Sequence, residues 1–300
     1  MSMNKGFKKV YLEPENRIFS EMMSNGKQYT IPRFQRDYAW QETQWDELWL
    51  DIEAMLANRT QHFMGYLVFK VGDGKLFEVI DGQQRLTTVL LILLAGLRRL
   101  QTLIDQGQDQ QDNQRRIALY KERYFTVFDA VTLRPSAKIT LNRHNKAHFI
   151  DLCKQHNVIQ QRHITKTNRK INQAFQFFEK KFQAYPSGDA IAAVMDDVTD
   201  GLLFTTVTVQ DDLDAYTVFA TLNARGLHLS TPDLLKNYLL AKFAHDDQYT
   251  DYHFDEFDQK WSDILDQLGE KEFTAFLRSH IGMSDKIPKN LELYLSLIHI

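Results

Sequence analysis

The sequence predicts an α+β fold, in which a small sheet with helices is followed by a largely helical region. Two short β-like runs, residues 64–69 and 76–80, are separated by Gly72-Asp73-Gly74, which indicates a hairpin. From residue 86 onward the leucines and valines recur with the helical period, so the second strand leads directly into a helix. The run 202–209 is rich in β-branched residues and is the strongest strand prediction in the second half.

Composition and charge indicate an ordinary soluble globular protein. Of the 300 residues, 43% are hydrophobic and 25% are charged, so the chain can bury a sizeable core. The net charge is −3, and any contact with nucleic acid must therefore come from a local basic patch. Cys153 is the only cysteine, which excludes an intrachain disulfide and favours a reducing compartment. We expect a cytoplasmic protein.

The apolar segments are too short for a membrane protein. The longest apolar run, residues 89–95, is far below the ~20 residues that span a bilayer, so we expect a core helix there. The polar start of the chain does not resemble a secretory signal. No membrane partner is expected.

The middle of the chain is predicted to be mostly helical. Residues 105–113 are polar and predict a solvated loop, and a helix is expected around 115–128 with a short strand near 138–141. A longer helix over 166–184 places its aromatic residues on one face, with Ile171, Phe175 and Phe178 among them.

After the strand at 202–209, a helix is expected from about 212 to 222. Asn223-Ala224-Arg225-Gly226 has the residue types that end a helix in a left-handed conformation, and residues 230–233 have those that begin another. A further helix is indicated around 261–268, after an acidic stretch. We place a soft domain boundary near residue 246.

The most informative segment is Asp81-Gly82-Gln83-Gln84-Arg85, where a strand ends and a helix begins. A helix N-terminus presents free N–H groups to an anion, and Arg85 adds a bidentate donor suited to phosphate. Asp81 has the chemistry to hold a metal ion or accept a proton, and Gln83 and Gln84 to orient a water. The alternative is structural: Asp81 caps the helix with Gln84 in a capping box, and Arg85 is merely solvated.

A second segment, residues 31–40, interleaves Arg33 and Arg36 with aromatic residues. This pattern suits stacking on a base while contacting phosphate. The alternative is an extended arm whose Phe34, Tyr38 and Trp40 cover a hydrophobic core, with both arginines directed outward.

A third segment contains Asn223, Arg225 and Gly226, with Lys236 further along. Helix caps explain Asn223 and Gly226, whereas Arg225 and Lys236 have the chemistry to face a phosphate. The sequence His144-Asn145-Lys146-Ala147-His148 has the letters of a nuclease metal site, but it is too compact for one, so no zinc site is predicted there.

Four blocks, IPRFQRDYAW, HFMGYLVF, EVIDGQQRLTT and FATLNARGLHLSTPDLLKN, resemble in order and spacing the signatures of the GmrSD-type restriction family. The resemblance spans residues 31–237 and implies a ParB/sulfiredoxin-like domain. It implies nucleotide hydrolysis at the block formed by Asp81, Gly82, Gln83, Gln84 and Arg85. It implies nucleotide or phosphate binding at Arg33, Gln35, Arg36, Tyr38, Trp40, Asn223, Arg225 and Gly226, to which Lys236 is added.

This resemblance also implies the function and partners. We expect a nucleoside triphosphatase that senses and regulates in a modification-dependent, type IV-like restriction system for phage defence, with modified DNA as partner. Mg²⁺ is the expected cofactor, with Asp81 as its ligand. The alternatives are a non-catalytic DNA-binding module and a ParB-like nuclease. Nothing beside Asp81 supplies the several hard ligands that two-metal DNA cleavage needs, which argues against the nuclease. Whether the chain forms a homo-oligomer stays open.

The same resemblance predicts the domain organisation. Residues 1–245 would form the nucleotide-handling domain with a helical extension, and 246–294 would begin a connector to an HNH-type nuclease domain. Residues 295–300 resemble the translated end of a sequencing adapter, so we expect the natural protein to continue past Tyr294. Cleavage of DNA by this chain alone is therefore not expected.

Overall fold

The computed structural model describes residues 14–32, 35–129, 131–155, 164–210, 232, 235–236, 239–240 and 250–282. The chain divides into two compact units, one formed by Met1–Pro32 with Arg36–Gln210 and the other by Arg33–Gln35 with Asp211–Ile300. The first unit combines a mixed sheet with helices, so the predicted α+β class is confirmed.

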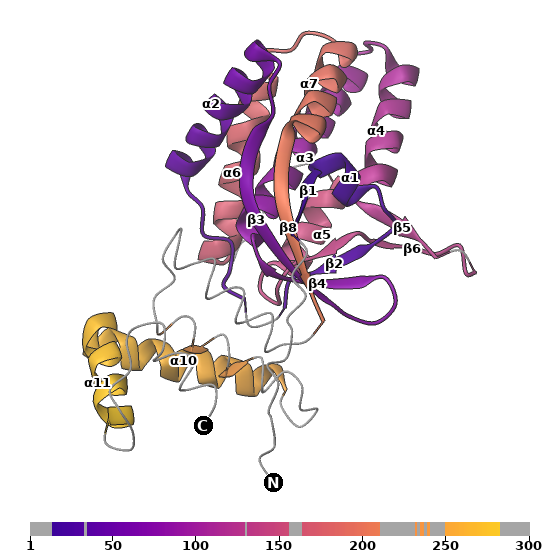
Figure 1. The fold of residues 1–300 in the computed structure, drawn as a ribbon. Coiled ribbons are helices and arrows are strands. Elements are labelled where there is room, and N and C mark those ends of the chain that lie inside the picture. Colours follow the sequence, from indigo (N-terminus) through magenta and orange to yellow (C-terminus); the bar gives the residue numbers. More distant parts are fainter. Residues whose placement is uncertain are drawn as a thin grey trace. The chain divides into compact units, whose positions relative to one another are not determined.

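A six-stranded sheet forms the frame of the described part of the first unit (Figure 1). In spatial order its strands are β1 (Pro14–Ile18), β8 (Leu202–Val209), β3 (His62–Val71), β4 (Leu76–Asp81), β2 (Gln28–Thr30) and β7 (Ile139–Thr140). The pairs β1–β8 and β3–β4 are antiparallel, and the other neighbouring pairs are parallel. The long β3–β8 pair therefore joins the predicted hairpin to the strand predicted at 202–209, and both predictions are confirmed.

Helices connect the strands of this sheet along the chain. In the first unit they are α1 (Phe19–Met23), α2 (Glu42–Asn58), α3 (Gln83–Asp105), α4 (Gln110–Tyr124), α5 (Lys146–Gln155), α6 (Lys166–Phe182) and α7 (Gly188–Gly201). A separate two-stranded ribbon is formed by β5 (Thr126–Phe128) and β6 (Pro135–Ala137). The helix predicted at 166–184 is confirmed as α6, and its Ile171, Phe175 and Phe178 are fully buried.

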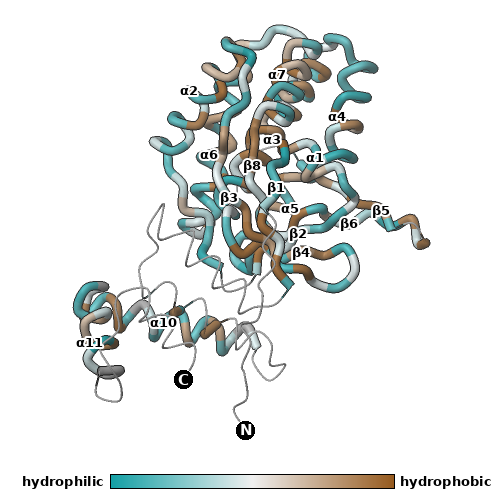
Figure 2. The backbone as a smooth tube through the Cα atoms, viewed as in Figure 1, coloured by the Kyte–Doolittle hydropathy of each residue, from teal (hydrophilic) through white to brown (hydrophobic). Residues whose placement is uncertain are grey.

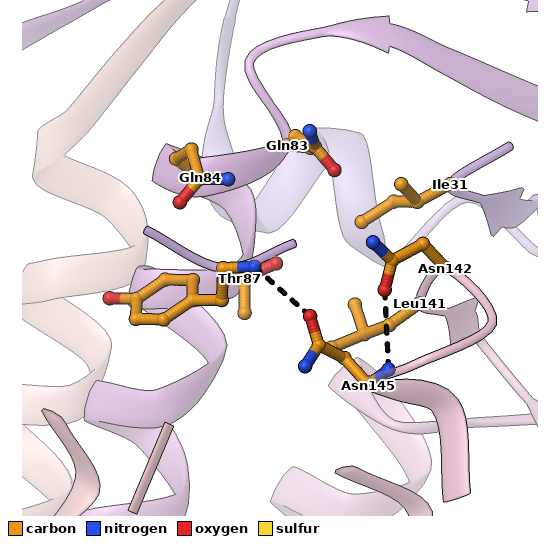
Figure 3. A pocket seen from close by; sticks show the side chains of 8 residues that line it. Ile31, Gln83, Gln84, Thr87, Leu141, Asn142 and Asn145 are labelled. Carbon is orange, nitrogen blue, oxygen red and sulfur yellow. Dashed lines mark hydrogen bonds between the residues drawn. The ribbon is translucent and has the colours of Figure 1, made fainter. Parts of the chain in front are cut away.

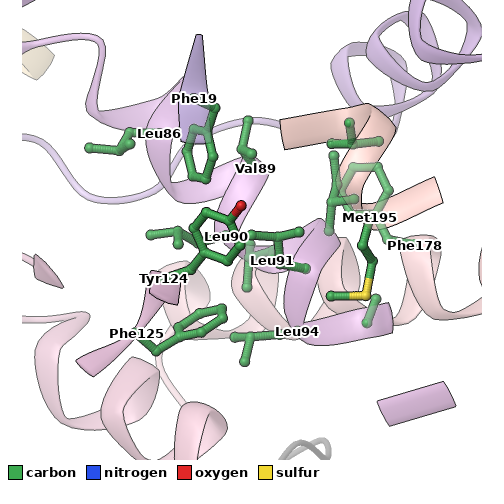
Figure 4. Packing of buried hydrophobic residues seen from close by; sticks show 14 of the residues in the cluster. Phe19, Leu86, Val89, Leu90, Leu91, Leu94, Tyr124, Phe125, Phe178 and Met195 are labelled. Carbon is green, nitrogen blue, oxygen red and sulfur yellow. The ribbon is translucent and has the colours of Figure 1, made fainter. Parts of the chain in front are cut away.

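The helix α3 is the centre of the core. It contacts α4, α6 and α7, and its residues 86–97 are almost completely buried. Figure 4 shows Leu90, Leu91 and Leu94 of α3 among aromatic residues of neighbouring elements. Hydrophobic residues also gather on α7 and β8, while the outer turns of α4 are hydrophilic (Figure 2).

By length and composition α3 could also cross a membrane, but 78% of its most apolar window is buried inside the protein. This burial agrees with the prediction that residues 89–95 belong to a core helix. Gly96 permits the close packing, because a Cβ atom there would lie 2.5 Å from Met195 Sδ.

Two predictions in the middle of the first unit had the wrong bounds. The polar stretch 105–113 is not one loop, since α3 continues to Asp105 and α4 already begins at Gln110. Its Asn113 is buried because its side chain donates to Gln108 O (3.0 Å) and accepts from Arg116 (2.8 Å). The helix expected over 115–128 ends at Tyr124, where the chain turns into β5.

The second unit has its own small core. Its helices α10 (Asp251–Leu268) and α11 (Glu270–Gly282) confirm the helix indicated around 261–268. The ring of Trp261 lies edge-on to Phe273 at 5.3 Å, and Leu235 and Leu277 pack in the same cluster. The division between the units falls after Gln210, ahead of the boundary expected near residue 246. The helix expected at 212–222 lies outside the described residues.

Candidate functional site

The N-terminus of α3 follows β4 after one residue, Gly82. This glycine, not Asp81, is the N-cap, with φ at 87°, and its carbonyl accepts from Leu86 N at 3.0 Å. Asp81 is the last residue of β4. The capping box of the structural alternative is therefore absent, and no side chain caps α3. A Cβ atom at Gly82 would lie 2.1 Å from Leu67 Cδ2, so the position needs glycine for both space and backbone conformation.

Asp81 and Arg85 form an ion pair across the first turn of α3. Their side chains approach to 3.5 Å, and each is about a quarter exposed. Arg85 Nη1 also donates to Met64 O at 2.9 Å, so the guanidinium is held from two sides. Gly65 makes this possible, because a Cβ atom there would lie 2.1 Å from Arg85 Nη1. Arg85 is therefore a fixed group rather than a solvated one.

Burial and nearby positive charge shift the pKa of Asp81 in opposite directions. Desolvation raises the pKa of Asp81, whereas Arg85, the Gly82 N–H and the charge of Arg36 act to lower it. Desolvation lowers the pKa of Arg85, and Asp81 opposes this shift. Burial therefore disfavours the charged form of both side chains. An anion entering here would meet two guanidinium groups and an uncapped helix N-terminus.

Gln83 and Gln84 hold the segment 36–39 against α3. Both side chains are only 7% exposed. Gln84 uses both ends of its amide, since Nε2 donates to Asp37 O at 3.1 Å and Oε1 accepts from Ala39 N at 2.8 Å. Gln83 Nε2 donates to Arg36 O at 3.1 Å. The two glutamines therefore fix a loop from the arginine-aromatic block beside the helix N-terminus.

Tyr38, in the same segment, has its ring in the core. It is 4% exposed, and its hydroxyl lies 2.8 Å from Thr88 Oγ1 and 2.9 Å from Trp45 Nε1. Burial raises the pKa of Tyr38 well above its usual range. Trp40 is partly buried against the same core, and Arg36 is exposed. For Tyr38, Trp40 and Arg36 this arrangement matches the alternative in which aromatic residues cover the core and the arginines point outward, while Arg33 and Phe34 lie outside the described residues.

A polar cluster between β7 and α5 completes the site, and sequence reasoning missed most of it. Asn142 Nδ2 donates to Asp37 Oδ1 at 2.8 Å, and Asn145 Oδ1 accepts from Tyr38 N at 3.0 Å. The His144 ring nitrogen Nδ1 lies 3.1 Å from each carboxylate oxygen of Asp37. The available signal was two asparagines flanking Arg143-His144 directly after a predicted strand, a polar run that is buried at both ends.

A small pocket lies between these groups. Figure 3 shows Gln83, Gln84 and Thr87 of α3 facing Asn142 and Asn145 across it. Its cavity volume is about 10 Å³, room for about one water molecule. A nucleotide cannot enter a space of this size, so any phosphate contact by these residues takes place at the rim.

The residues fit a resident magnesium ion poorly. Among the described residues, no group of three or more His, Cys, Asp or Glu side chains could hold a metal ion. Asp81 would offer Mg²⁺ one carboxylate, and this carboxylate is already paired with Arg85. Mg²⁺ usually needs one or two carboxylates together with substrate phosphates.

The other predicted site residues fall outside the described residues or belong to the second unit. Arg33, Asn223, Arg225 and Gly226 are outside the described residues. Gln35 is buried and belongs to the second unit. Lys236 also belongs to the second unit, where its Nζ pairs with Asp258 at 3.0 Å. Of the predicted site, the structure therefore brings together Asp81 to Arg85 with Arg36 and the segment that follows it.

Comparison with known proteins identifies the family. The profile of the GmrSD restriction endonuclease N-terminal domain matches residues 19–240, which is more than half of the chain. No curated protein matches the sequence. The matched span contains the strand, the turn and the helix that carry Asp81 to Arg85, as well as the segment 36–39. The chain therefore belongs to the GmrSD restriction endonuclease N-terminal domain family, which serves restriction and anti-phage defence.

Proposed function

We propose that this chain hydrolyses nucleoside triphosphates and acts as the sensing and regulatory domain of a modification-dependent restriction system. The observation that carries the proposal is the strand-turn-helix at Asp81 to Arg85. There an uncapped helix N-terminus and the fixed Arg85 guanidinium lie beside Asp81, and the charge of a second arginine, Arg36, acts on the same carboxyl group. Family membership supports the restriction context, with DNA as the partner.

The geometry supports a role for each group in this proposal. The first N–H groups of α3 and the Arg85 guanidinium bind phosphate oxygens, because a helix N-terminus and a bidentate donor both favour anions. Arg36, exposed beside them, neutralises the charge that develops on the leaving phosphate. Gln83 and Gln84 position the segment that carries Arg36. Magnesium enters as the counter-ion of the triphosphate, and no step is assigned to it.

The test is phosphate release from each of the four ribonucleoside triphosphates, with magnesium present and with or without modified DNA. The unaltered chain should release phosphate, and Arg85→Ala should lose this activity by ~100-fold or more, as expected when a group that stabilises the transition-state charge is removed. Arg59→Ala is the matched control. Arg59, like Arg85, is an arginine that pairs with an aspartate, Asp197 at 2.9 Å, but it is exposed and has no part in the proposed site. Equal rates for the unaltered chain and Arg85→Ala would refute the proposal.

A non-catalytic DNA-binding module is the second candidate. It is favoured by the exposed Lys166 and Arg169 at the start of α6, where Lys170 also reaches Ala39 O at 3.4 Å. These cations would contact backbone phosphates without any chemistry. DNA binding without turnover of any triphosphate would select this candidate.

A further inference from the structure

Two aromatic residues of β3, Phe63 and Tyr66, form an exposed pair that has no role in the proposed function so far. They are 50% and 42% exposed, and their ring centroids lie 6.0 Å apart with the ring planes at 89°. Residues three apart in a regular strand point to opposite faces of a sheet. The register of β3 against β8 shifts between Phe63 and Gly65, however, and this irregularity places both rings on the outer face of the sheet, while Met64 and Leu67 are buried.

The main chain between these two rings touches the proposed phosphate site. Arg85 Nη1 donates to Met64 O at 2.9 Å and occupies the space that a side chain at Gly65 would fill. The next carbonyl oxygen along the strand, that of Tyr66, would lie 3.0 Å from a Cβ atom at Gly82. Tyr66 directly follows Gly65, so its Cα lies only about 3.8 Å from that of the glycine that Arg85 abuts. The aromatic pair therefore flanks the point where Arg85 meets β3.

The edge of β3 at this point is not covered by a strand of the described part of the chain. β4 pairs with β3 only from Val68 onward, and it ends at Asp81, which lies opposite Val68. From Val68 back toward Phe63, the edge of β3 meets Arg85 and the turn at Gly82 instead. A ligand whose phosphate contacts Arg85 thus has no described strand between it and the outer face that carries the two rings.

The size and chemistry of the aromatic pair fit one nucleobase. A whole aromatic side chain buries about 150–250 Å², so two half-exposed rings offer roughly 200 Å² of apolar surface. A stable protein interface takes about 800 Å² from each partner, which is far more than this pair provides. Aromatic side chains stack on nucleobases of every kind, because each base has a π-face. A planar base attached to phosphates therefore suits both the rings and the guanidinium beside them.

We propose that Phe63 and Tyr66 bind the nucleobase of the triphosphate whose phosphates bind at Arg85. The base stacks on the outer face of β3, and the phosphates lie at the strand edge, against Arg85 and the start of α3. This inference rests on the proposed function, and it specifies the substrate as a nucleoside triphosphate rather than an inorganic polyphosphate. It also gives a role to the block HFMGYLVF, which contains both rings and lies outside the DGQQR block.

The test compares a ligand that has a base with one that has none. Calorimetry on the full chain measures the affinity for non-hydrolysable analogues of the four nucleoside triphosphates and for a non-hydrolysable inorganic triphosphate. Phe63→Ala and Tyr66→Ala should each weaken binding of the nucleoside analogues by about 5- to 150-fold, the scale of one lost stacking contact. Both variants should bind the inorganic triphosphate as the unaltered chain does. Phe63→Tyr and Tyr66→Phe keep a ring at each position and should bind both kinds of ligand normally.

Two further variants complete the design. Phe128→Ala is the matched control, because Phe128 is a phenylalanine on another strand, β5, with a similar exposure of 53%. Arg85→Ala should weaken binding of both kinds of ligand. If Phe63→Ala and Tyr66→Ala bind the nucleoside analogues as tightly as Phe128→Ala does, or lose both kinds of ligand equally, the stacking assignment is wrong. Phosphate release that depends on Arg85 would then still support the hydrolase proposal, whereas a chain that binds neither kind of ligand would overturn both.

Discussion

Asp81 does not cap α3, although its position in the sequence suggested that it could. The cap is Gly82, so removing the Asp81 carboxylate removes no hydrogen bond from the end of α3. Removing the carboxylate breaks the 3.5 Å ion pair with Arg85, which stabilises the fold. It also removes the cost of burying a carboxylate, the desolvation that raises the pKa of Asp81. These two effects on stability have opposite signs.

Asp81→Asn should therefore leave the melting temperature nearly unchanged and reduce hydrolysis by ~100-fold, because asparagine keeps the shape but no longer holds the Arg85 guanidinium in place for phosphate. Thermal unfolding and phosphate release on the same preparation provide the measurement. Arg85→Lys should also lose activity, since lysine keeps the charge and lacks the planar pair of donors. Full activity in Asp81→Asn would show that Arg85 does not depend on Asp81 for its position.

At the scale of elements, the strand β3 shapes the site through a single glycine. Its pairing with β8 shifts register between Phe63 and Gly65, and Gly65 has φ at 97°. The Arg85 guanidinium occupies the space that a side chain at Gly65 would need. The irregularity in β3 thus determines where the arginine of α3 can lie.

Gly65→Ala should displace Arg85 and lower both stability and hydrolysis. The positive φ costs an alanine about 1–2 kcal/mol, and the steric overlap adds roughly 1–3 kcal/mol. Gly74→Ala is the control: its φ is 63°, but a Cβ atom there would meet nothing within 4 Å, so only the first cost applies. Urea unfolding of both variants measures the difference. Equal losses of stability, with hydrolysis retained in Gly65→Ala, would contradict this account.

Sequence patterns predicted those elements whose hydrophobic period is strong. The hairpin, α3, α6 and β8 were predicted because their apolar residues alternate or recur over long runs. The strand β1 was not, because Pro14–Ile18 is polar at an edge and pairs with β8 residues that lie far away in the chain. The helix α2 was missed although Trp45, Leu48 and Ile52 follow a helical spacing and are buried.

The candidate site was predictable only in part, and for a similar reason. A strand, a glycine and a helix in succession were sufficient to place Asp81 to Arg85 at a helix N-terminus. The partners of Gln84, by contrast, lie about 45 residues earlier in the chain, and those of Asp37 lie about 105 residues later. Local periodicity carries no information about such hydrogen bonds, which tertiary packing alone brings together.

For the whole molecule, the net charge of −3 limits how DNA can bind. The basic residues Lys166, Arg169 and Lys170 lie at the start of α6, and Arg162 is outside the described residues. If these four cations neutralise phosphates, the plot of log affinity against log salt should have a slope of about −3 to −4. Lys166→Gln and Arg169→Gln should each make the slope less steep by about one. Fluorescence anisotropy across a salt series measures this, and tight binding that salt does not weaken would contradict it.

The division into two units leads to the last prediction. The first unit closes on itself, because β1 near its start pairs with β8 at its end, in register from Pro14 with Val207 to Ile18 with Leu203. Its core also includes α3, α6 and α7, all of which precede Gln210. A fragment of residues 1–210 should therefore fold and unfold in one cooperative transition.

The described groups that we propose to bind phosphate, Arg36, Arg85 and the start of α3, all lie in that fragment. It should therefore bind a non-hydrolysable triphosphate analogue, and Arg85→Ala in the same fragment should abolish binding. Circular dichroism during heating tests the folding, and calorimetry with the analogue tests the site. A fragment that folds but does not bind would show that residues after Gln210 supply contacts that bound nucleotide requires, which would direct attention to Asn223, Arg225 and Gly226. A fragment that does not fold would show that the pairing of β1 with β8 is insufficient to close the first unit.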